Sequence, residues 1–484
     1  MNTEKKRINL LDFIKKYKYE MTLACILILS FGLNFYAISA NGTANEYYSA
    51  AIKSMTMSFK NFFFVAFDPS GMVSVDKPPL GFWIQAVFVL IFGYHGWAMM
   101  LPQALAGTFS CFMMYRLVGR YFPKGAALIS ALTFALTPIV VAVSRNNTID
   151  MQLIFCLLLA TDFLFSAIQK GKWRYLFIAS IFIGLGFNIK MLQAYLIIPA
   201  FAAVYLIFAK EKLVKRFIAG IISMVLVFAV SFAWVFAVDL YPSNSRPYVD
   251  SSTNNTVTEL ILGHNGLERI QGQGNGGGMG QKGEGGNGPS PGGTPPQNGN
   301  MQAPPNMGSS SSSGTTASTN KSTTSNTNTN TEAGTNTSSN GSDGQMRGMP
   351  SGSHDGTHNG QGGGGMDNIG STSIVRMWTS NLFGQASWLF AFCFIAILAF
   401  MLSLIKNFKK KQRDMKQCSM VFWTLWFLTM FVFFSFAGFY HRYYLCMFAP
   451  GVAALTGIGL HDAFLFRLAW TLDKIGRASC RERV

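Results

Sequence analysis

Long apolar runs separated by short polar segments constrain this chain more than any other feature. A helix of about 20 residues rises ~30 Å and so crosses the hydrocarbon core of a bilayer. Runs of comparable length with few or no charges lie at residues 21–40, 97–115, 125–144, 151–169, 175–189, 191–209, 217–238, 386–405, 418–440 and 443–460. With 49% hydrophobic and only 13% charged residues, the chain is predicted to be an all-α polytopic membrane protein.

The distribution of basic residues predicts how the chain is oriented. The net charge is +17, but the lysines and arginines gather in short segments between the apolar runs, which is typical of cytoplasmic loops. Nucleic acid is therefore not expected as a partner. The apolar run at 80–93 is too short to cross and suits an interfacial helix. If this run does not cross, the N-terminus and every strongly basic loop face the cytoplasm.

This topology divides the chain into six parts. Residues 272–370 consist of Gly, Ser, Asn, Thr, Gln and Pro with almost no large apolar side chains, so they cannot offset their chain entropy and are predicted to be a disordered tether. The tail at 466–484 lacks the composition of the spans and is expected to be truncated or non-native at its end. The predicted parts are a basic cytoplasmic N-terminus at 1–20, an N-terminal transmembrane module at 21–240 with an outer loop at 41–96, an ordered outer segment at 241–271 with a short helix at 257–262, the insert at 272–370, further spans at 371–465, and the tail.

The outer loop holds the strongest candidates for chemistry. In this interpretation residues 45–93 contain two interfacial helices, and the segment 45–85 also holds paired prolines and many aromatic residues. A loop pressed against the bilayer surface could bring its charged side chains together near a lipid head group. These side chains are Glu46, Asp68, Asp76 and Lys77.

Three further groups of polar residues fall on the same predicted face. Asp150 and Lys190 lie in short outer turns at 145–150 and 188–191. At such membrane-boundary positions a charged side chain costs a few kcal/mol unless it has water or a partner. Each could also simply extend to the interface. Asp162 lies deeper in its run and is predicted to be a helix-packing partner. The late segment GFYHRYY contains His441, Arg442 and Tyr443, which suit either phosphate binding or an aromatic interface belt.

Together these residues resemble a known family. The acidic start of the first loop, the sequence D-K-P-P-L at 76–80, Asp150 and Lys190 are similar to the GT-C glycosyltransferases that use polyprenyl-phosphate sugars. The resemblance is to bacterial members of the protein O-mannosyltransferase group, including lipid A aminoarabinose transferases and mannosyltransferases of Gram-positive bacteria. It covers residues 40–465 apart from the insert. The segments RPYVDSSTNN (246–255) and LGHNGLERIQG (262–272) also resemble the Gram-positive branch, without a role that we can assign from sequence.

The resemblance implies roles for the first-loop residues. The family's catalytic carboxylate belongs to an Asp-Glu pair that matches Asn45 and Glu46, and an amide cannot act as a base. Glu46, Asp68 or Asp76 would then have to take that role. Asp76 and Lys77 match an acidic-Lys pair that organises the site and contacts phosphate, although a purely structural ion pair is the alternative. Asp76 could also hold a divalent metal.

For the remaining positions the resemblance implies substrate binding or support of the site. Asp150 matches the family's outer Asp, and Lys190 matches a lysine near the donor phosphate. Arg442 and Tyr443 match a late Arg-Tyr segment close to the lipid phosphate. The other substrate-binding candidates are Asn45, Tyr47 and His441.

The function that the resemblance implies is hexose transfer, with mannose or glucose as the sugar, from undecaprenyl phosphate to an acceptor outside the bacterial cytoplasmic membrane. A single displacement would invert the anomeric centre. The acceptor could be a cell-wall polymer, a glycolipid or a surface protein. A transporter or flippase of a lipid-linked sugar is an alternative, although the internally repeated halves typical of transporters are not visible in the sequence. A catalytically inactive relative is a third alternative, which Asn45 keeps open.

The composition of the insert gives a first testable prediction. Deleting residues 276–365 should leave membrane insertion and donor turnover largely unchanged, because a tether without apolar side chains contributes nothing to the packing of the spans. Fractionation of membranes and donor-cleavage rates at matched expression check this. Loss of folding on deletion would contradict the tether interpretation.

Overall fold

The computed structural model describes residues 10–267, 369–385, 387–406 and 414–463. Within these residues the chain is helical, and its only strand-like pairings are two isolated bridges, between Ala66 and Ser74 and between Val73 and Tyr248. The predicted all-α fold class is confirmed. The predictions for the insert and for the tail fall on positions outside the described residues.

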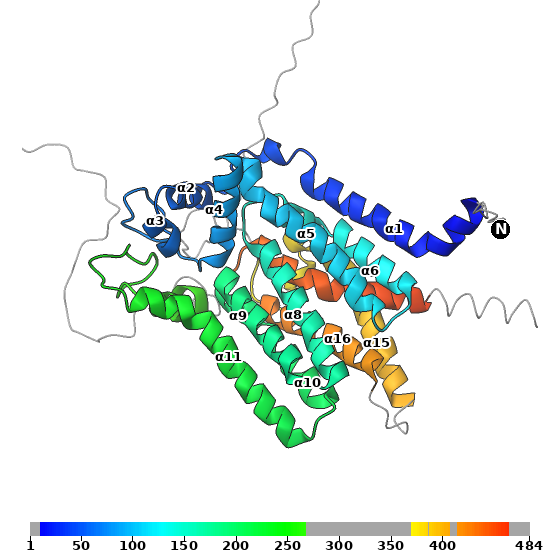
Figure 1. Ribbon diagram of the computed structural model, residues 1–484. Helices are drawn as coiled ribbons and strands as arrows, with labels where there is room; N and C mark the ends of the chain where they lie inside the picture. The colour runs from blue at the N-terminus through cyan, green and yellow to red at the C-terminus, as the bar shows by residue number, and fades with distance from the viewer. Residues whose placement is uncertain (1–9, 268–368, 386, 407–413, 464–484) are drawn as a thin grey trace, which may run out of the picture. The chain divides into compact units, whose positions relative to one another are not determined.

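The helices follow the apolar runs (Figure 1). A further helix follows η5, and together they form one apolar segment, Arg442–Ala463. In chain order the elements are α1 (Leu10–Phe35), η1 (Ile38–Asn41), α2 (Glu46–Met55), α3 (Phe59–Phe64), α4 (Leu80–Phe92), α5 (Gly96–Gly119), α6 (Lys124–Leu136), α7 (Pro138–Ser144), α8 (Asp150–Lys170), α9 (Trp173–Tyr195), α10 (Ile198–Phe208), α11 (Leu213–Asp239), α12 (Val257–Leu262), η2 (Gly263–Leu267), η3 (Arg376–Trp378), α14 (Ser380–Phe383), η4 (Ser387–Leu389), α15 (Phe390–Lys406), α16 (Met415–Phe436) and η5 (Arg442–Phe448).

The number of spans differs from the ten that the sequence predicts. In the described part of the chain, seven helices are long and apolar enough to cross a membrane, or eight if α6 and α7, bent by 59°, form one span. The predicted span at 191–209 is wrong in its bounds, because α10 has only 11 residues and rises roughly 16 Å. The predicted turn at 188–191 is instead a break inside α9. An apolar pattern cannot show this, because a bend leaves the composition unchanged.

The first outer loop contains three helices where the sequence predicts two. Asn45 caps α2 by accepting a hydrogen bond from the Tyr48 N–H at 3.0 Å, and Ser58 caps α3 in the same way at Asn61. α4 has 13 residues and rises roughly 20 Å, too little to cross a bilayer. The short helix predicted at 257–262 is confirmed as α12.

The loop helices pack onto one end of the longer helices. α4 contacts α5 and α9, and the Trp234 indole N–H of α11 donates to the Phe63 carbonyl of α3 at 3.0 Å (Figure 1). α8 is largely enclosed by the rest of the described chain and packs against α9, α5 and α10. Since α8 and α9 begin and break beside the loop helices, their ends are the natural place for polar side chains to meet the loop.

Asp162 on α8 is held by Arg116 of α5 and by Arg120, which directly follows α5, as predicted for a helix-packing residue. Arg120 Nη1 lies 2.8 Å from Asp162 Oδ1, and Arg116 Nη2 lies 3.1 Å from Asp162 Oδ2. The Asp162 side chain is 13% exposed and that of Arg120 is 18% exposed. Removing the carboxylate would leave a poorly hydrated guanidinium without its partner.

We predict that Asp162→Ala lowers the stability of the detergent-solubilised protein by about 2 kcal/mol, because it strips the partner from a mostly buried cation. Thermal unfolding measures the change. Glu20→Gln is the matched control, since the Glu20–Lys124 pair is 52% exposed on both sides and solvent screens exposed pairs of that kind, so they contribute little to stability. Equal effects of the two substitutions would contradict a packing role for Asp162.

Candidate functional site

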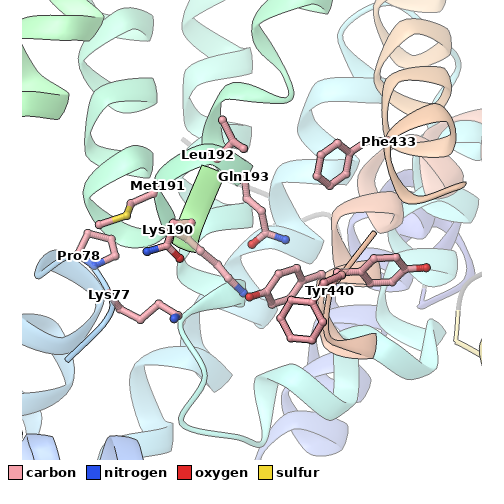
Figure 2. Close-up of a pocket in the computed structure, with 11 residues that line it drawn as sticks. Lys77, Pro78, Lys190, Met191, Leu192, Gln193, Phe433 and Tyr440 are labelled. Atoms are coloured by element: carbon pink, nitrogen blue, oxygen red, sulfur yellow. The ribbon is translucent and has the colours of Figure 1, made fainter. Parts of the chain in front are cut away.

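A partly open pocket lies between the first loop, the break in α9 and the segment that follows α16 (Figure 2). The lining is mixed, with two ammonium groups, two amides and several aromatic rings. Its residues are Lys77, Pro78, Lys190, Met191, Leu192, Gln193, Asn265, Phe433, Phe439, Tyr440 and Tyr444. The structure therefore brings together two lysines, Lys77 and Lys190, that are far apart in sequence.

Lys77 enters the pocket as part of a buried ion pair with Asp76. The Lys77 side chain is 7% exposed and that of Asp76 is 15% exposed. Asn265 Nδ2 donates to the Asp76 carbonyl at 3.0 Å, and His264 Nε2 lies 3.4 Å from Asp76 Oδ2. Burial alone would raise the pKa of Asp76, but the Lys77 ammonium and the His264 imidazole outweigh it and hold that pKa below its usual range. The carboxylate is thus a stable anion and a poor proton acceptor.

Lys190 is held by a second, deeper pair with Asp150. Lys190 Nζ lies 2.5 Å from Asp150 Oδ1, with side chains 7% and 1% exposed. The ammonium also sits over the rings of Tyr444 and Tyr443, 3.7 and 4.7 Å from their centroids. α9 is interrupted at Lys190 and Met191 by non-helical torsions, which direct this segment at the pocket. A carboxylate and two π-faces compensate the buried charge.

At the start of α2, Asn45 and Tyr47 are structural in their contacts. The Asn45 N–H donates to Asn147 Oδ1 at 2.9 Å, and Asn147 Nδ2 donates back to the Asn45 carbonyl at 3.0 Å. The Tyr47 hydroxyl donates to Asp250 Oδ2 at 2.8 Å. Burial, followed by the charges of Asp76 and Asp250, raises the pKa of Tyr47, so its hydroxyl stays protonated. Glu46 is exposed on the first turn of the helix.

Asp68 closes a turn within the first loop. Its Oδ2 accepts hydrogen bonds from the N–H groups of Met72 and Val73, each at 2.9 Å. Burial acts to raise the pKa of Asp68, but these backbone donors outweigh it and lower the pKa. Neither Asp68 nor Glu46 is among the described residues that line the pocket.

The late segment reaches the pocket through residues adjacent to the predicted ones. The His441 imidazole stacks on Tyr443, with ring centroids 5.1 Å apart and planes 5° apart. Arg442 begins η5. The pocket itself is lined by Tyr440 and Tyr444. Sequence analysis thus identified the segment but not the two tyrosines, since alternating aromatics give no sign of which ring faces inward.

The second loop, at 241–267, packs against the first loop. The Arg246 side chain is 3% exposed and donates to the Asn255 carbonyl at 2.6 Å and towards Asp239 Oδ1 at 3.4 Å. The backbone of Tyr248 then bonds to the first loop, donating to the Met72 carbonyl at 2.6 Å. The segment at 246–255 and the described part of 262–272, residues 262–267, which the sequence singled out without a role, therefore place Asp250, His264 and Asn265 against the first loop. Gln193 carried no sequence signal, because it is one polar residue in an apolar run.

The described residues contain no group of three or more His, Cys, Asp or Glu side chains placed to hold a metal ion. At Asp76 the nearest possible partner ligand is His264, and the Lys77 ammonium already stands next to the carboxylate. A divalent cation would have to compete with that ammonium for the same oxygen. The residues described at Asp76 do not fit a metal site, and no chemical step below uses one.

The fold is that of the GT-C glycosyltransferases, which are multi-span membrane proteins. Crystal structures of ArnT from Cupriavidus metallidurans, in the apo state and bound to undecaprenyl phosphate, align with TM-scores of 0.51 and 0.52 at 13% and 12% identity. They cover 93% and 92% of this chain and 60% of the ArnT chain. An Archaeoglobus fulgidus oligosaccharyltransferase tethered with an acceptor peptide aligns with a TM-score of 0.51 at 14% identity, over 93% of this chain and 50% of its own.

Sequence comparison confirms the resemblance to the protein O-mannosyltransferase group. Residues 76–235 match the family described as "Dolichyl-phosphate-mannose-protein mannosyltransferase". Two proteins of Bacillus subtilis (strain 168), "Putative mannosyltransferase YycA" and "Putative mannosyltransferase YkcB", are 44% and 40% identical over 449 and 463 residues. These alignments cover 92% of this chain in each case, but the chain spans only 64% and 62% of the two relatives' lengths.

The lowered pKa of Asp76 predicts a specific pH dependence of stability. A carboxylate whose folded pKa lies below its unfolded value of about 3.9 contributes stability fully above that value and loses it as the pH falls further. The difference in melting temperature between the wild type and Asp76→Asn should therefore not shrink from pH 8 to 5 and should shrink below about pH 4. A difference that already shrinks between pH 7 and 5 would contradict the stable ion pair.

Proposed function

We propose that this chain is the membrane part of a glycosyltransferase that moves a hexose, mannose or glucose, from undecaprenyl phosphate to an acceptor outside the cytoplasmic membrane. The observation that carries the proposal is the convergence of Lys77 and Lys190, both buried, on one pocket with aromatic walls. The similarity to mannosyltransferases and to an ArnT structure bound to undecaprenyl phosphate supports a lipid-phosphate donor.

The charge of the reacting phosphate explains why two buried lysines suit this reaction. A lipid-phosphate sugar is a phosphodiester with one negative charge, and its phosphate gains a second charge as the bond to the sugar breaks. Fixed ammonium groups interact more strongly with the phosphate as it becomes doubly charged than with the singly charged phosphate of the bound donor. They therefore lower the barrier and not only the energy of the bound donor. Lys77 and Lys190 are placed to do this without reorganisation, because Asp76 and Asp150 already hold them.

The transfer is a single displacement. A base removes the proton of the acceptor hydroxyl, the acceptor oxygen bonds to the anomeric carbon, and the bond from that carbon to the phosphate oxygen breaks with inversion. Asp76 is held as an anion by Lys77, and Asp68 is engaged by backbone N–H groups. We therefore assign the base to Glu46, the exposed carboxylate at the start of α2. Asn45 is explained as a helix cap, a position where Asn and Asp are equally good.

The surface of the loop helices supports a position at the outer membrane interface. An apolar groove of about 580 Å³ between α3 and α4 is lined by Met57, Phe59, Phe62 and Leu90 among others. Phe59 and Leu90 are 79% and 60% exposed. Such surfaces suit lipid, and we place the isoprenoid tail and neighbouring membrane lipids there. The N-terminus is then inside and the pocket outside, in accordance with the positive-inside rule. The acceptor would be a cell-wall polymer, a glycolipid or a surface protein.

The experiment that tests the function is donor cleavage. Purified protein is incubated with radiolabelled undecaprenyl-phosphate mannose or glucose and a cell-wall fraction as acceptor source, and loss of sugar from the lipid is followed. We expect one of the two sugars to be released. Binding of both lipids without release of either sugar would instead identify an inactive relative, and their movement across the bilayer would identify a flippase.

Four variants test the residue assignments. Lys77→Met keeps the stem and deletes the charge, and should reduce turnover ~10²- to 10³-fold, as does loss of other preorganised donors. Glu46→Gln should reduce turnover at least as much as Lys77→Met.

Asp68→Asn should reduce turnover only slightly, because an amide oxygen still accepts the hydrogen bonds from the two backbone N–H groups. Lys60→Met, on the exposed surface of α3, should change the rate less than about threefold as the matched charge control. Near-normal turnover in Lys77→Met would refute a catalytic first loop.

A further inference from the structure

We propose that Gln193 binds the hydroxyl groups of the donor's sugar and so helps to select which hexose is accepted. The proposal rests on the proposed function, because it needs a sugar in the pocket. It concerns a residue three positions after Lys190, on the same interrupted end of α9. In Figure 2 the Gln193 amide points from that end towards the aromatic side chains on the opposite wall.

The first observation is that the Gln193 amide is buried without partners. The residue is 7% exposed, and among the residues that the structure describes neither Nε2 nor Oε1 has a hydrogen-bond partner. Leaving such a group buried and unpaired destabilises the folded protein, because its bonds to water are lost and not replaced. The residue nevertheless lines the pocket. An amide that costs stability in the free protein and faces a binding site is explained by a ligand that completes its hydrogen bonds.

The chemistry of the amide identifies the part of the donor that it meets. Nε2 is a donor and Oε1 is an acceptor. A phosphate diester offers acceptors only, so it could pair with Nε2 but would leave Oε1 unpaired. An isoprenoid offers neither. A hydroxyl group both donates and accepts, and two neighbouring hydroxyls on a sugar ring can satisfy both amide atoms together.

The surroundings of Gln193 agree with a sugar site next to a phosphate site. Lys190, on one side, supplies a cation for the phosphate that is attached directly to the sugar. Phe433 and Tyr440 form part of the same lining. A hexose ring has polar edges and an apolar C–H face, and aromatic rings bury such a face favourably. Gln193 would then contact the hydroxyl edge while the rings contact the C–H face.

Gln103 on α5 provides a matched control. It is also fully buried, with both amide atoms unpartnered among the described residues, but it does not line the pocket. Replacing either glutamine by Met keeps the length and removes the unpaired amide. If Gln193 serves a ligand, only the change at Gln193 should alter sugar binding. Neither change should lower the melting temperature of the ligand-free protein, since each removes a buried polar group that has no partner.

The test measures the binding of two lipids to wild type, Gln193→Met and Gln103→Met. One is the undecaprenyl-phosphate hexose whose sugar is cleaved. The other is undecaprenyl phosphate, which lacks the sugar and, as a monoester, carries a second phosphate charge, so each lipid is compared between variants. We expect Gln193→Met to weaken binding of the sugar-bearing lipid about 5- to 30-fold, a loss typical of one or two hydrogen bonds. Binding of undecaprenyl phosphate should change less than about twofold. Gln103→Met should match the wild type with both lipids.

Two outcomes would overturn the proposal while leaving the proposed function intact. Equal weakening for both lipids would make Gln193 part of the phosphate site. If the wild type cleaves the donor, while Gln193→Met binds both lipids as the wild type does and has a lowered melting temperature, then Gln193 is a structural residue. If Met at this position prevents folding, the same comparison with Gln193→Leu decides the question. Failure of the wild type to bind or cleave either sugar lipid would instead overturn the proposed function.

Discussion

The arrangement of the pocket depends on compensation of buried charge between Lys190 and Asp150. An ion taken out of water at this depth costs several kcal/mol unless an opposite charge stands next to it. Lys190 lies at the break in α9 and Asp150 in the first turn of α8, so the pair fixes how these two packed helices are aligned. The rings of Tyr443 and Tyr444 cover the ammonium and hold η5 at the same place. One buried charge thereby positions three elements around the pocket.

The first loop also contains a buried lysine whose charge is compensated by a carboxylate, closer to the protein surface. Lys77 is buried against Asp76, and η2 of the second loop completes the surroundings of Asp76 through His264 and Asn265. The second loop is itself organised by the buried guanidinium of Arg246. Polar networks of this kind are costly when incomplete, so each loop is stable in this position only when the other is present. This dependence gives a physical role to the segments at 246–255 and 262–272.

The sequence predicted those elements that are determined by residues close together in the chain. Apolar runs predicted the helices, and the short run at 80–93 forms the 13-residue helix α4. Charges in apolar surroundings stand out, so Lys77, Asp150 and Lys190 were identified, although their roles stay predictions. The interruption near Lys190 was predicted only as a turn at 188–191 between two spans, and the shortness of α10 was not predicted, because an apolar pattern does not show whether a helix bends or ends. Partners such as His264 were not assignable, since their contacts join residues almost 190 positions apart.

Pairing each lysine with a carboxylate also has a consequence for turnover under the proposed function. The charge that develops as the sugar leaves persists in the product, so two unpaired ammonium groups would bind the product lipid phosphate as strongly as they stabilise the transition state. Asp76 and Asp150 compete with that phosphate for Lys77 and Lys190. They lower its affinity while keeping both cations in position. The carboxylates thus balance rapid bond breaking against release of the spent carrier, a balance that a site built from lysines alone would lack.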